Sequence, residues 1–494
     1  MAFMALIGAL LVPGEGTGAG AGGAGAGEAE AGEAGPAAAG SGGAPAGSTT
    51  VVPGSGGLVT PVLSLRRVPG LLSRWASDSR LRAELDGALA DPALGTGAAR
   101  ACLVARQGAR RVYERRAADQ LIPASNMKLL VASAALSRLG PQGRLVTEAR
   151  TAQPPANGVV AGPLWVVGGG DPLLDTNDFA TTFTKADLLP PSVEPRPHTA
   201  YEQLADRIRD AGVRQISGGI VGDDGRYDGQ RFIATWKTSY AASGEVGPMG
   251  ALVVNDGFAQ FTPRVVIAPA PAVHAAALLT SLLQARGVKV TAPPSQGAAP
   301  KTAFVLAGLP SLPISQIVAT MLRESDNNAA EDLVKELGAR FAGQGTTAAG
   351  LAVVRATLQS SQLPVDQYFA VDGSGLDRAD HASCGLVLDV LQAPQPGDTI
   401  AAGLPIAART GTLGRRFLGT PAAGRLRAKT GSLEGVVSLS GLVDERDGSP
   451  LGFAMLVNDV PRDAVGRALE DRVGVAMARW PEVTATPDLG PAGG

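Results

Sequence analysis

Three short polar motifs occur in one order along this chain of 494 residues. They are Ser125-Asn-Met-Lys128, Ser325-Asp-Asn327 and Lys429-Thr-Gly431. The second motif begins 200 residues after the first, and the third begins 104 residues after the second. A gap of 200 residues is as long as a whole domain, since domains contain roughly 50–250 residues. A fold that unites the three motifs must therefore accommodate an inserted domain between the first and the second.

The first motif is predicted to lie at the start of a helix. Apolar residues recur from Met127 to Leu139, and Gly140 followed by proline is typical of a helix end. Ser125 should therefore lie at the helix N-terminus, with Lys128 one turn further along the same face.

The other two motifs fall on a helix corner and on a strand. Helical periodicity over residues 314–323 breaks at Ser325 and resumes over 329–341, which predicts a tight connection between two helices. Lys429 belongs to an apolar run over 426–430 that predicts a strand. Further strands are predicted at 101–106, 111–115, 436–443 and 451–457, with a turn at Asp447-Gly448 and helices at 81–89 and 463–480.

These residue types suit acyl transfer through a serine. A serine hydroxyl is a poor nucleophile unless a base lies nearby, and a lysine can be that base once burial and positive neighbours lower its pKa. We therefore expect Ser125 to be the nucleophile and Lys128 its base. Ser325 could relay a proton, and Asn327 could bond both Lys128 and a substrate amide.

The third motif suits a substrate that carries a carboxylate. Lys429, Thr430 and Ser432 supply a cation and two hydroxyls, and Gly431 lets a substrate backbone approach closely. The backbone N–H groups of Ser125 and Ser432 would form an oxyanion hole.

Each motif alone also fits an ordinary structural role. Serine is a common helix N-cap beside a surface lysine, and Ser, Asp and Asn are common in turns. Lys429 could be an edge-strand lysine. Arg409-Thr-Gly-Thr412 imitates the third motif, but its surroundings resemble a loop, so the strand context favours Lys429.

The composition narrows the function. A net charge of −2 gives no reason to expect a nucleic-acid partner. Cys102 and Cys384 lie outside any metal-binding spacing, so we expect two unpaired, buried thiols, with a disulfide as the alternative. His198, His274 and His381 lack metal-binding or nucleophile-elbow spacing, which argues against a metal site and against a Ser-His-Asp triad.

The N-terminus predicts an exported protein. Residues 2–12 form an apolar run of 11 residues, too short for a membrane-spanning helix, that is similar to a signal-peptide core without its basic start. Residues 14–57 are rich in Gly and Ala and predict a flexible tether. The alternative is an N-terminus without any role in export.

With these residues in place, the chain resembles the class C low-molecular-mass penicillin-binding proteins, which are D-alanyl-D-alanine carboxypeptidases/endopeptidases. The motif trio is their signature, and the long first gap fits their inserted domain. Secondary matches are Pro123-Ala-Ser-Asn-Met-Lys128, Gly169-Gly-Asp-Pro172, Val254-Asn-Asp-Gly257, Asp372-Gly-Ser-Gly-Leu376, Gly411-Thr-Leu413 and Ala428-Lys-Thr-Gly-Ser-Leu433.

The resemblance implies an α+β serine transpeptidase fold like that of penicillin-binding proteins and β-lactamases. An antiparallel sheet flanked by helices, plus a helical subdomain, would be interrupted by a β-rich insert. The expected boundaries are a signal-like segment and tether at 1–57, the transpeptidase-like domain at 58–146 and 306–485, the insert at 147–305 and a tail at 486–494. The insert should contain strands near 164–167, 219–222 and 265–268 and helices near 200–211 and 272–285.

The resemblance also implies a function. Ser125 would attack the D-Ala-D-Ala peptide of peptidoglycan stem peptides, Lys429, Thr430 and Ser432 would hold the terminal carboxylate, and β-lactams would acylate Ser125. No cofactor is implied, and peripheral membrane association through the N-terminus is expected. The alternatives are a wall-peptide binding or sensing homologue of low activity, and a β-lactamase.

Overall fold

The computed structural model describes residues 69–182, 196–445 and 449–481, all within one compact unit, Val62–Gly494. The predicted signal-like segment and tether, the tail at 486–494 and the predicted turn at Asp447-Gly448 therefore lie outside the described residues. Among the described residues, no helix combines the length and the apolar character that crossing a membrane requires.

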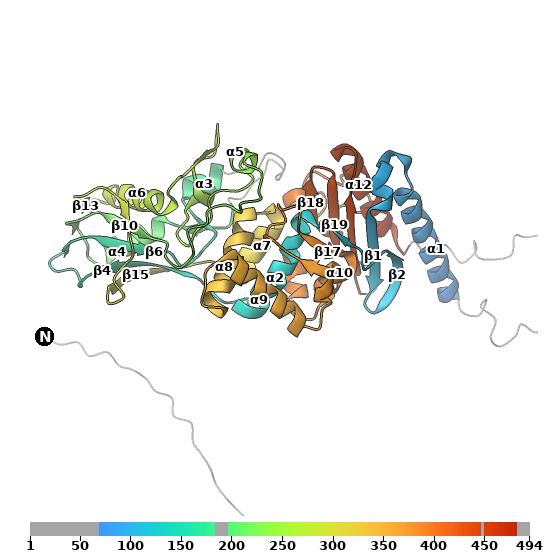
Figure 1. Cartoon of the computed structure of the whole chain (residues 1–494), viewed down its shortest axis with the longest axis horizontal. Coiled ribbons are helices and arrows are strands. Elements are labelled where there is room, and N and C mark those ends of the chain that lie inside the picture. The colour runs from blue at the N-terminus through green and yellow to red at the C-terminus, as the bar shows by residue number, and fades with distance from the viewer. Residues whose placement is uncertain (1–68, 183–195, 446–448, 482–494) are drawn as a thin grey trace, which may run out of the picture. The chain divides into compact units, whose positions relative to one another are not determined.

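A five-stranded antiparallel sheet unites the first and last strands of the described chain, in the order β18-β19-β20-β1-β2 (Figure 1). Its strands are β1 (Ala101–Gln107), β2 (Arg110–Arg115), β18 (Leu426–Leu433), β19 (Val436–Val443) and β20 (Leu451–Asn458). Every residue of β19 and β20 is buried, so both faces of these strands are covered. Strands buried on both faces have largely apolar sequences, which is why these two were predicted almost to the residue.

Helices cover both faces of this sheet. Helices α1 (Pro69–Leu89) and α12 (Asp463–Arg479) pack on one face, where Leu85, Leu103 and Phe453 share a core. Helix α10 (Cys384–Gln392) packs on the other face, which Cys102 and Val104 of β1 point toward. Successive residues of a strand alternate between the faces, so β1 contributes to both cores.

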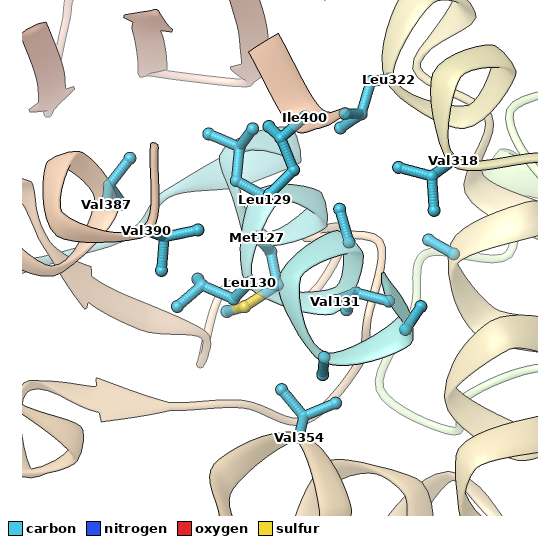
Figure 2. Packing of buried hydrophobic residues seen from close by; sticks show 14 of the residues in the cluster. Met127, Leu129, Leu130, Val131, Val318, Leu322, Val354, Val387, Val390 and Ile400 are labelled. Atoms are coloured by element: carbon cyan, nitrogen blue, oxygen red, sulfur yellow. The ribbon is translucent and has the colours of Figure 1, made fainter. Parts of the chain in front are cut away.

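Helix α2 (Met127–Leu139) forms the centre of the second core, and 11 of its 13 residues are buried. It is surrounded by α7 (Ile314–Glu324), α8 (Asn327–Phe341), α9 (Thr347–Ser360), α10 and α11 (Gly397–Gly403). Figure 2 shows α2 residues Met127, Leu129, Leu130 and Val131 among Val318, Leu322, Val354, Val387, Val390 and Ile400. A helix that is apolar on nearly all sides has a fixed place in a close-packed interior, so the residues at its start are held rigidly.

The segment between the first two motifs builds a second sheet with its own core. Its strand order is β14-β10-β6-β4-β15, with parallel pairing at β14-β10-β6 and antiparallel pairing at β6-β4-β15. The strands are β4 (Val146–Thr151), β6 (Leu164–Val167), β10 (Ile220–Asp223), β14 (Ser295–Gln296) and β15 (Phe304–Pro310). Helices α4 (Glu202–Asp210) and α6 (Pro271–Gln284) pack on it. The sheet extends to Pro310, past the predicted boundary of the insert at residue 305.

The remaining elements are short. The strands are β3 (Gln120–Leu121), β5 (Val159–Val160), β7 (Leu174–Asp175), β8 (Thr199–Ala200), β9 (Gln215–Ile216), β11 (Phe258–Gln260), β12 (Val266–Ile267), β13 (Lys289–Val290), β16 (Tyr368–Phe369) and β17 (His381–Ser383). The helices are α3 (Asn177–Thr182) and α5 (Ser239–Ala242), and 3-10 turns cover Pro92–Ala99, Ala124–Asn126, Asn255–Gly257, Val365–Gln367 and Gly411–Leu413.

Two predictions need correction. Ser125 does not start the α-helix itself but lies in the 3-10 turn that precedes α2. The interpretation of two unpaired thiols is wrong, because Cys102 and Cys384 form a disulfide with their Cα atoms 6.0 Å apart. The fold packs β1 against α10 although the two cysteines are separated by 282 residues, and no local sequence pattern reports such a contact.

Replacing both cysteines by alanine should lower the free energy of unfolding by about 2–5 kcal/mol, because the unfolded chain loses the constraint of a long closed loop. Equilibrium unfolding in urea measures the change. The wild type unfolded in the presence of dithiothreitol is the control and should match the double variant. An unchanged unfolding midpoint in both would contradict the prediction.

Candidate active site

The turn that carries Ser125 is held on the central sheet by side chains of two strands. The Ser438 hydroxyl of β19 donates to the carbonyl of Pro123 at 2.8 Å. The Asn458 side chain of β20 accepts from the backbone N–H of Ile122 at 2.8 Å and donates to its carbonyl at 3.1 Å. All of these groups are buried except Ser125 itself, which is partly exposed. The sheet thus sets the position of the hydroxyl of Ser125.

Lys128 joins the first motif to two other segments. Its Nζ lies 3.0 Å from Ser125 Oγ, 2.6 Å from Asn327 Oδ1 and 2.6 Å from the carbonyl oxygen of Ser374. Lys128 is fully buried. The spacing predicted from the sequence therefore brings Ser125 and Lys128 together, and the tertiary fold adds Asn327 from a position 199 residues away.

The second motif forms the corner between α7 and α8. Ser325 ends α7 in the left-handed conformation, at φ 58° and ψ 38°. Asp326 caps α8 by accepting from the N–H of Ala329 at 3.0 Å. Asn327 also donates to the carbonyl of Glu245 in the insert at 2.7 Å. Asp is a preferred N-cap residue, which explains why the helical pattern breaks at this point.

The third motif approaches the second through its lysine. Lys429 Nζ donates to Ser325 Oγ at 2.9 Å and to the carbonyl of Thr430 at 2.7 Å, and Lys429 is fully buried. Each buried lysine of the site is thus bonded to one serine hydroxyl, Lys128 to Ser125 and Lys429 to Ser325.

Gly431 allows strand β18 to pass close to the nucleophile. A Cβ atom at this position would lie 2.2 Å from Ser438 Oγ and 2.9 Å from the backbone nitrogen of Ser125. Both distances are shorter than van der Waals contact, so any side chain would push β18 away from the turn that holds Ser125.

A cleft of about 980 Å³ opens over these groups. Six of the eight predicted site residues line it, namely Ser125, Ser325, Asn327, Thr430, Gly431 and Ser432. The other two, Lys128 and Lys429, are buried beneath it and bonded to lining serines. The insert contributes part of the opposite wall, including Tyr240, Glu245 and Phe261. The structure therefore brings all eight predicted residues to one place.

Sequence reasoning missed three contributors to the site. The carbonyl of Ser374 accepts from Lys128, and its own N–H donates to Glu331 at 2.7 Å. Glu331 follows Asn327 by four positions, which places both on one face of α8 and could have identified it. Thr412 belongs to the stretch that imitated the third motif, and its hydroxyl accepts from that of Thr430 at 2.9 Å.

Glu331 anchors the loop that carries Ser374. One carboxylate oxygen accepts from the N–H groups of Gly373 at 3.0 Å and Ser374 at 2.7 Å. Burial, reinforced by the nearby charge of Asp372, raises the pKa of Glu331 from 4.5 to about 8. Folding therefore takes up a proton at this carboxyl between those two pH values.

Replacing Glu331 by Gln should remove this pH dependence while keeping an acceptor for both N–H groups. The stabilisation linked to the proton is complete below pH 4.5 and is lost as the pH rises through about 8. The free energy of unfolding of the wild type should therefore fall more steeply with pH in this window than that of Glu331→Gln, by up to about 1.4 kcal/mol per pH unit. Urea unfolding at several pH values gives both slopes, and equal slopes would refute the linkage.

The sequence also matches proteins of known family. A model of the D-Ala-D-Ala carboxypeptidase 3 (S13) family matches residues 81–268 and 261–480. A D-alanyl-D-alanine carboxypeptidase of Actinomadura sp. (strain R39) is 28% identical over 482 residues, covering 81% of this chain and 85% of that protein. Carboxypeptidase DacB of Mycolicibacterium smegmatis is 30% identical over 409 residues, covering 80% of this chain and 83% of that protein.

Solved structures match the fold. Penicillin binding protein 4 (dacB) from Haemophilus influenzae has a TM-score of 0.63 at 19% identity, covering 76% of this chain and 94% of that chain. A second structure of that protein, complexed with a β-lactam, has a TM-score of 0.58 at the same 19% identity, with the same 76% and 94% covered. The predicted α+β fold of the penicillin-binding proteins is confirmed.

Proposed function

We propose that Ser125 is the nucleophile of this chain, which belongs to the D-Ala-D-Ala carboxypeptidase 3 (S13) family and is a serine D-Ala-D-Ala carboxypeptidase/endopeptidase. The observation that carries the assignment is the Lys128 Nζ, which lies within hydrogen-bond distance of Ser125, Asn327 and the carbonyl of Ser374 at once. In this proposal Ser125 attacks the peptide carbonyl of D-Ala-D-Ala and forms an acyl-enzyme that water then hydrolyses.

The geometry around Lys128 supports its role as the base. A neutral amine has two N–H groups and one lone pair, and carbonyl oxygens can only accept hydrogen bonds. Asn327 Oδ1 and the Ser374 carbonyl therefore occupy the two N–H groups. A neutral Lys128 in this geometry can direct its lone pair at the Ser125 hydroxyl, 3.0 Å away, which is the direction that proton removal requires.

Ser325 would protonate the leaving group, and Lys429 would replace the proton that Ser325 gives up. The proton taken from Ser125 stays on Lys128 until water, which gives a proton back to Lys429 through Ser325, cleaves the acyl-enzyme and Ser125 is reprotonated by Lys128. Because Lys429 donates to Ser325 Oγ, the hydroxyl proton of Ser325 is available for the nitrogen of the departing D-Ala. The backbone N–H groups of Ser125 and Ser432 would stabilise the oxyanion, and Gly431 supports this by bringing β18 close to Ser125.

The hydroxyls of Thr412 and Ser432 would hold the substrate carboxylate, and Thr430 would orient that of Thr412. Thr430 donates its proton to Thr412 Oγ1 at 2.9 Å, and both residues line the cleft. The Thr412 hydroxyl then keeps its own proton to donate to the carboxylate, with Ser432 as a second donor. Lys429 adds a cation next to these hydroxyls, because its Nζ donates to the carbonyl of Thr430 at 2.7 Å.

We further propose that the protein acts outside the cytoplasm on peptidoglycan stem peptides and is acylated by β-lactams. The disulfide between Cys102 and Cys384 supports an oxidising compartment. The β-lactam complex of the Haemophilus influenzae protein supports the second part.

Ser125→Ala should abolish covalent labelling by a fluorescent penicillin. It should also lower D-Ala release from a diacyl peptide ending in D-Ala-D-Ala by at least about 1,000-fold, because the nucleophile is lost. Ser360→Ala is the control, since its hydroxyl only donates within α9 to the carbonyl of Thr357. Labelling that persists in Ser125→Ala would refute the assignment. Labelling of the wild type without D-Ala release would favour a binding role, and rapid turnover of penicillin would favour a β-lactamase.

Thr412→Val should reduce the second-order rate constant of acylation by roughly fivefold, which corresponds to one hydrogen bond of about 1 kcal/mol. Thr280→Val is the matched control, because that hydroxyl only donates within α6 to the carbonyl of Ala276. Acylation is followed by fluorescence on gels at several penicillin concentrations. If Thr412→Val reacted as fast as Thr280→Val, the carboxylate would be held without Thr412.

A further inference from the structure

One buried arginine of the insert lies among four carboxylates directly behind the second motif. Arg196 is only 5% exposed. Asp175 and Asp256 come from the insert, whereas Glu324 and Asp326 flank Ser325 at the corner between α7 and α8.

The guanidinium of Arg196 contacts all four acids. Its Nη1 donates to Asp256 Oδ2 at 2.6 Å, and its Nη2 donates both to Asp256 Oδ1 at 3.4 Å and to Asp326 Oδ2. Its Nε lies 3.5 Å from Glu324 and 3.7 Å from Asp175. A planar guanidinium has five N–H donors and can contact all four acids at once. A lysine ammonium has three donors and cannot make the same set of contacts.

The guanidinium of Arg196 offsets the negative charge of the acids around it. Burial alone would lower the pKa of Arg196, but the negative charges of Asp256, Asp175, Asp326 and Glu324 outweigh it and raise that pKa. Without the guanidinium, the acids of the insert would lie close to the acids of the motif corner, and the charge of Arg196 would no longer offset their repulsion. Like charges in a buried site repel strongly, so the corner would move away from the insert.

The part of the second motif that Arg196 holds is Asp326. This residue lies between Ser325, which accepts from Lys429, and Asn327, which accepts from Lys128. Its other carboxylate oxygen caps α8. Any movement of the Asp326 side chain therefore shifts both neighbours relative to the two buried lysines.

One sequence motif of the insert contributes directly to this cluster, and a second lies just before another of its acids. Asp256 belongs to Val254-Asn-Asp-Gly257, and Asp175 follows Gly169-Gly-Asp-Pro172. Asn255 ties the two together by accepting from the backbone N–H of Thr176 at 2.8 Å. The insert thus supplies two of the carboxyl groups that surround Arg196.

We propose that Arg196 is a positioning residue for acylation, which locks Ser325 and Asn327 in register with Lys429 and Lys128 through Asp326. The insert is then a working part of the active site rather than an appended domain. This inference rests on the function proposed above for Ser125.

A second ion pair between the insert and α8 provides a matched control. Arg226 donates to both carboxylate oxygens of Glu336 at 2.7 and 2.8 Å, further along the same helix. Arg226→Met should loosen the insert from α8 without touching the second motif. Arg196→Met should instead loosen the contact between the insert and the second motif itself.

The experiment follows acylation of the full-length protein by a fluorescent penicillin, and it separates the limiting rate constant from the fraction of protein labelled. Loss of folded protein lowers the labelled fraction, whereas misplacement of Ser325 and Asn327 lowers the rate constant. We expect Arg196→Met to lower the rate constant by at least about tenfold, because small displacements of catalytic groups have effects of that size. Arg226→Met should change the rate constant less than about twofold.

Two further variants test the route through Asp326 and keep the proposal testable if Arg196→Met folds poorly. Arg196→Lys keeps the charge but loses the fork, so its rate constant should also fall. In the Asp326→Asn background, Arg196→Lys should have a smaller effect than in the wild type, because coupled residues are not additive.

Three results would overturn the inference. A folded Arg196 variant with a wild-type rate constant would show that the arginine does not position the motif. An equal loss of rate in Arg226→Met would assign the effect to general docking of the insert, and effects of Arg196→Lys and Asp326→Asn that multiply would exclude the route through Asp326. If the wild type itself is not acylated, the proposed function fails first and this inference with it, which distinguishes the two failures.

Discussion

The hydrogen bonds of the buried Lys128 Nζ are the interactions on which the candidate site depends. Lys128 joins the start of α2, the start of α8 and the loop of Ser374, three segments that lie far apart in the sequence. Burying a lysine without partners is costly, so each of these segments must be held in place by other contacts. The apolar packing around α2 holds the first, and Glu331 holds the loop.

The insert completes the site through polar contacts with α8. Asn328 exchanges hydrogen bonds with the backbone of Gly247 at 2.8 and 3.2 Å, Lys335 binds Asp228, and Arg226 binds Glu336. Residues 327–338 of α8 are all buried, although many are charged. Charged residues are rarely buried unless paired, so this helix needs its partners from the insert. That dependence docks the insert on α8, while the position of Asn327 itself is set by its own bond to the Glu245 carbonyl of the insert at 2.7 Å.

Much of the sheet and of the site was predictable from local pattern. Strands β19 and β20 are largely apolar, and Ser325 and Lys429 lie on the corner and the strand expected of them, whereas Ser125 lies in a 3-10 turn just before the expected helix. Arg196, Glu331 and Thr412 were not predicted as site residues, because each acts through a partner distant in sequence. The pairing of Cys102 with Cys384 was missed for the same reason.

The sequence by itself determined the chemistry available to this protein, because two serine–lysine pairs in fixed order and spacing leave few alternatives for acyl transfer. It also determined that a domain-sized segment separates the first two motifs. Only the tertiary structure decided which groups orient each lysine and what holds the middle motif in place. Those contacts are hydrogen bonds and ion pairs between segments that lie far apart in sequence, and a periodic pattern carries information only about neighbours along the chain.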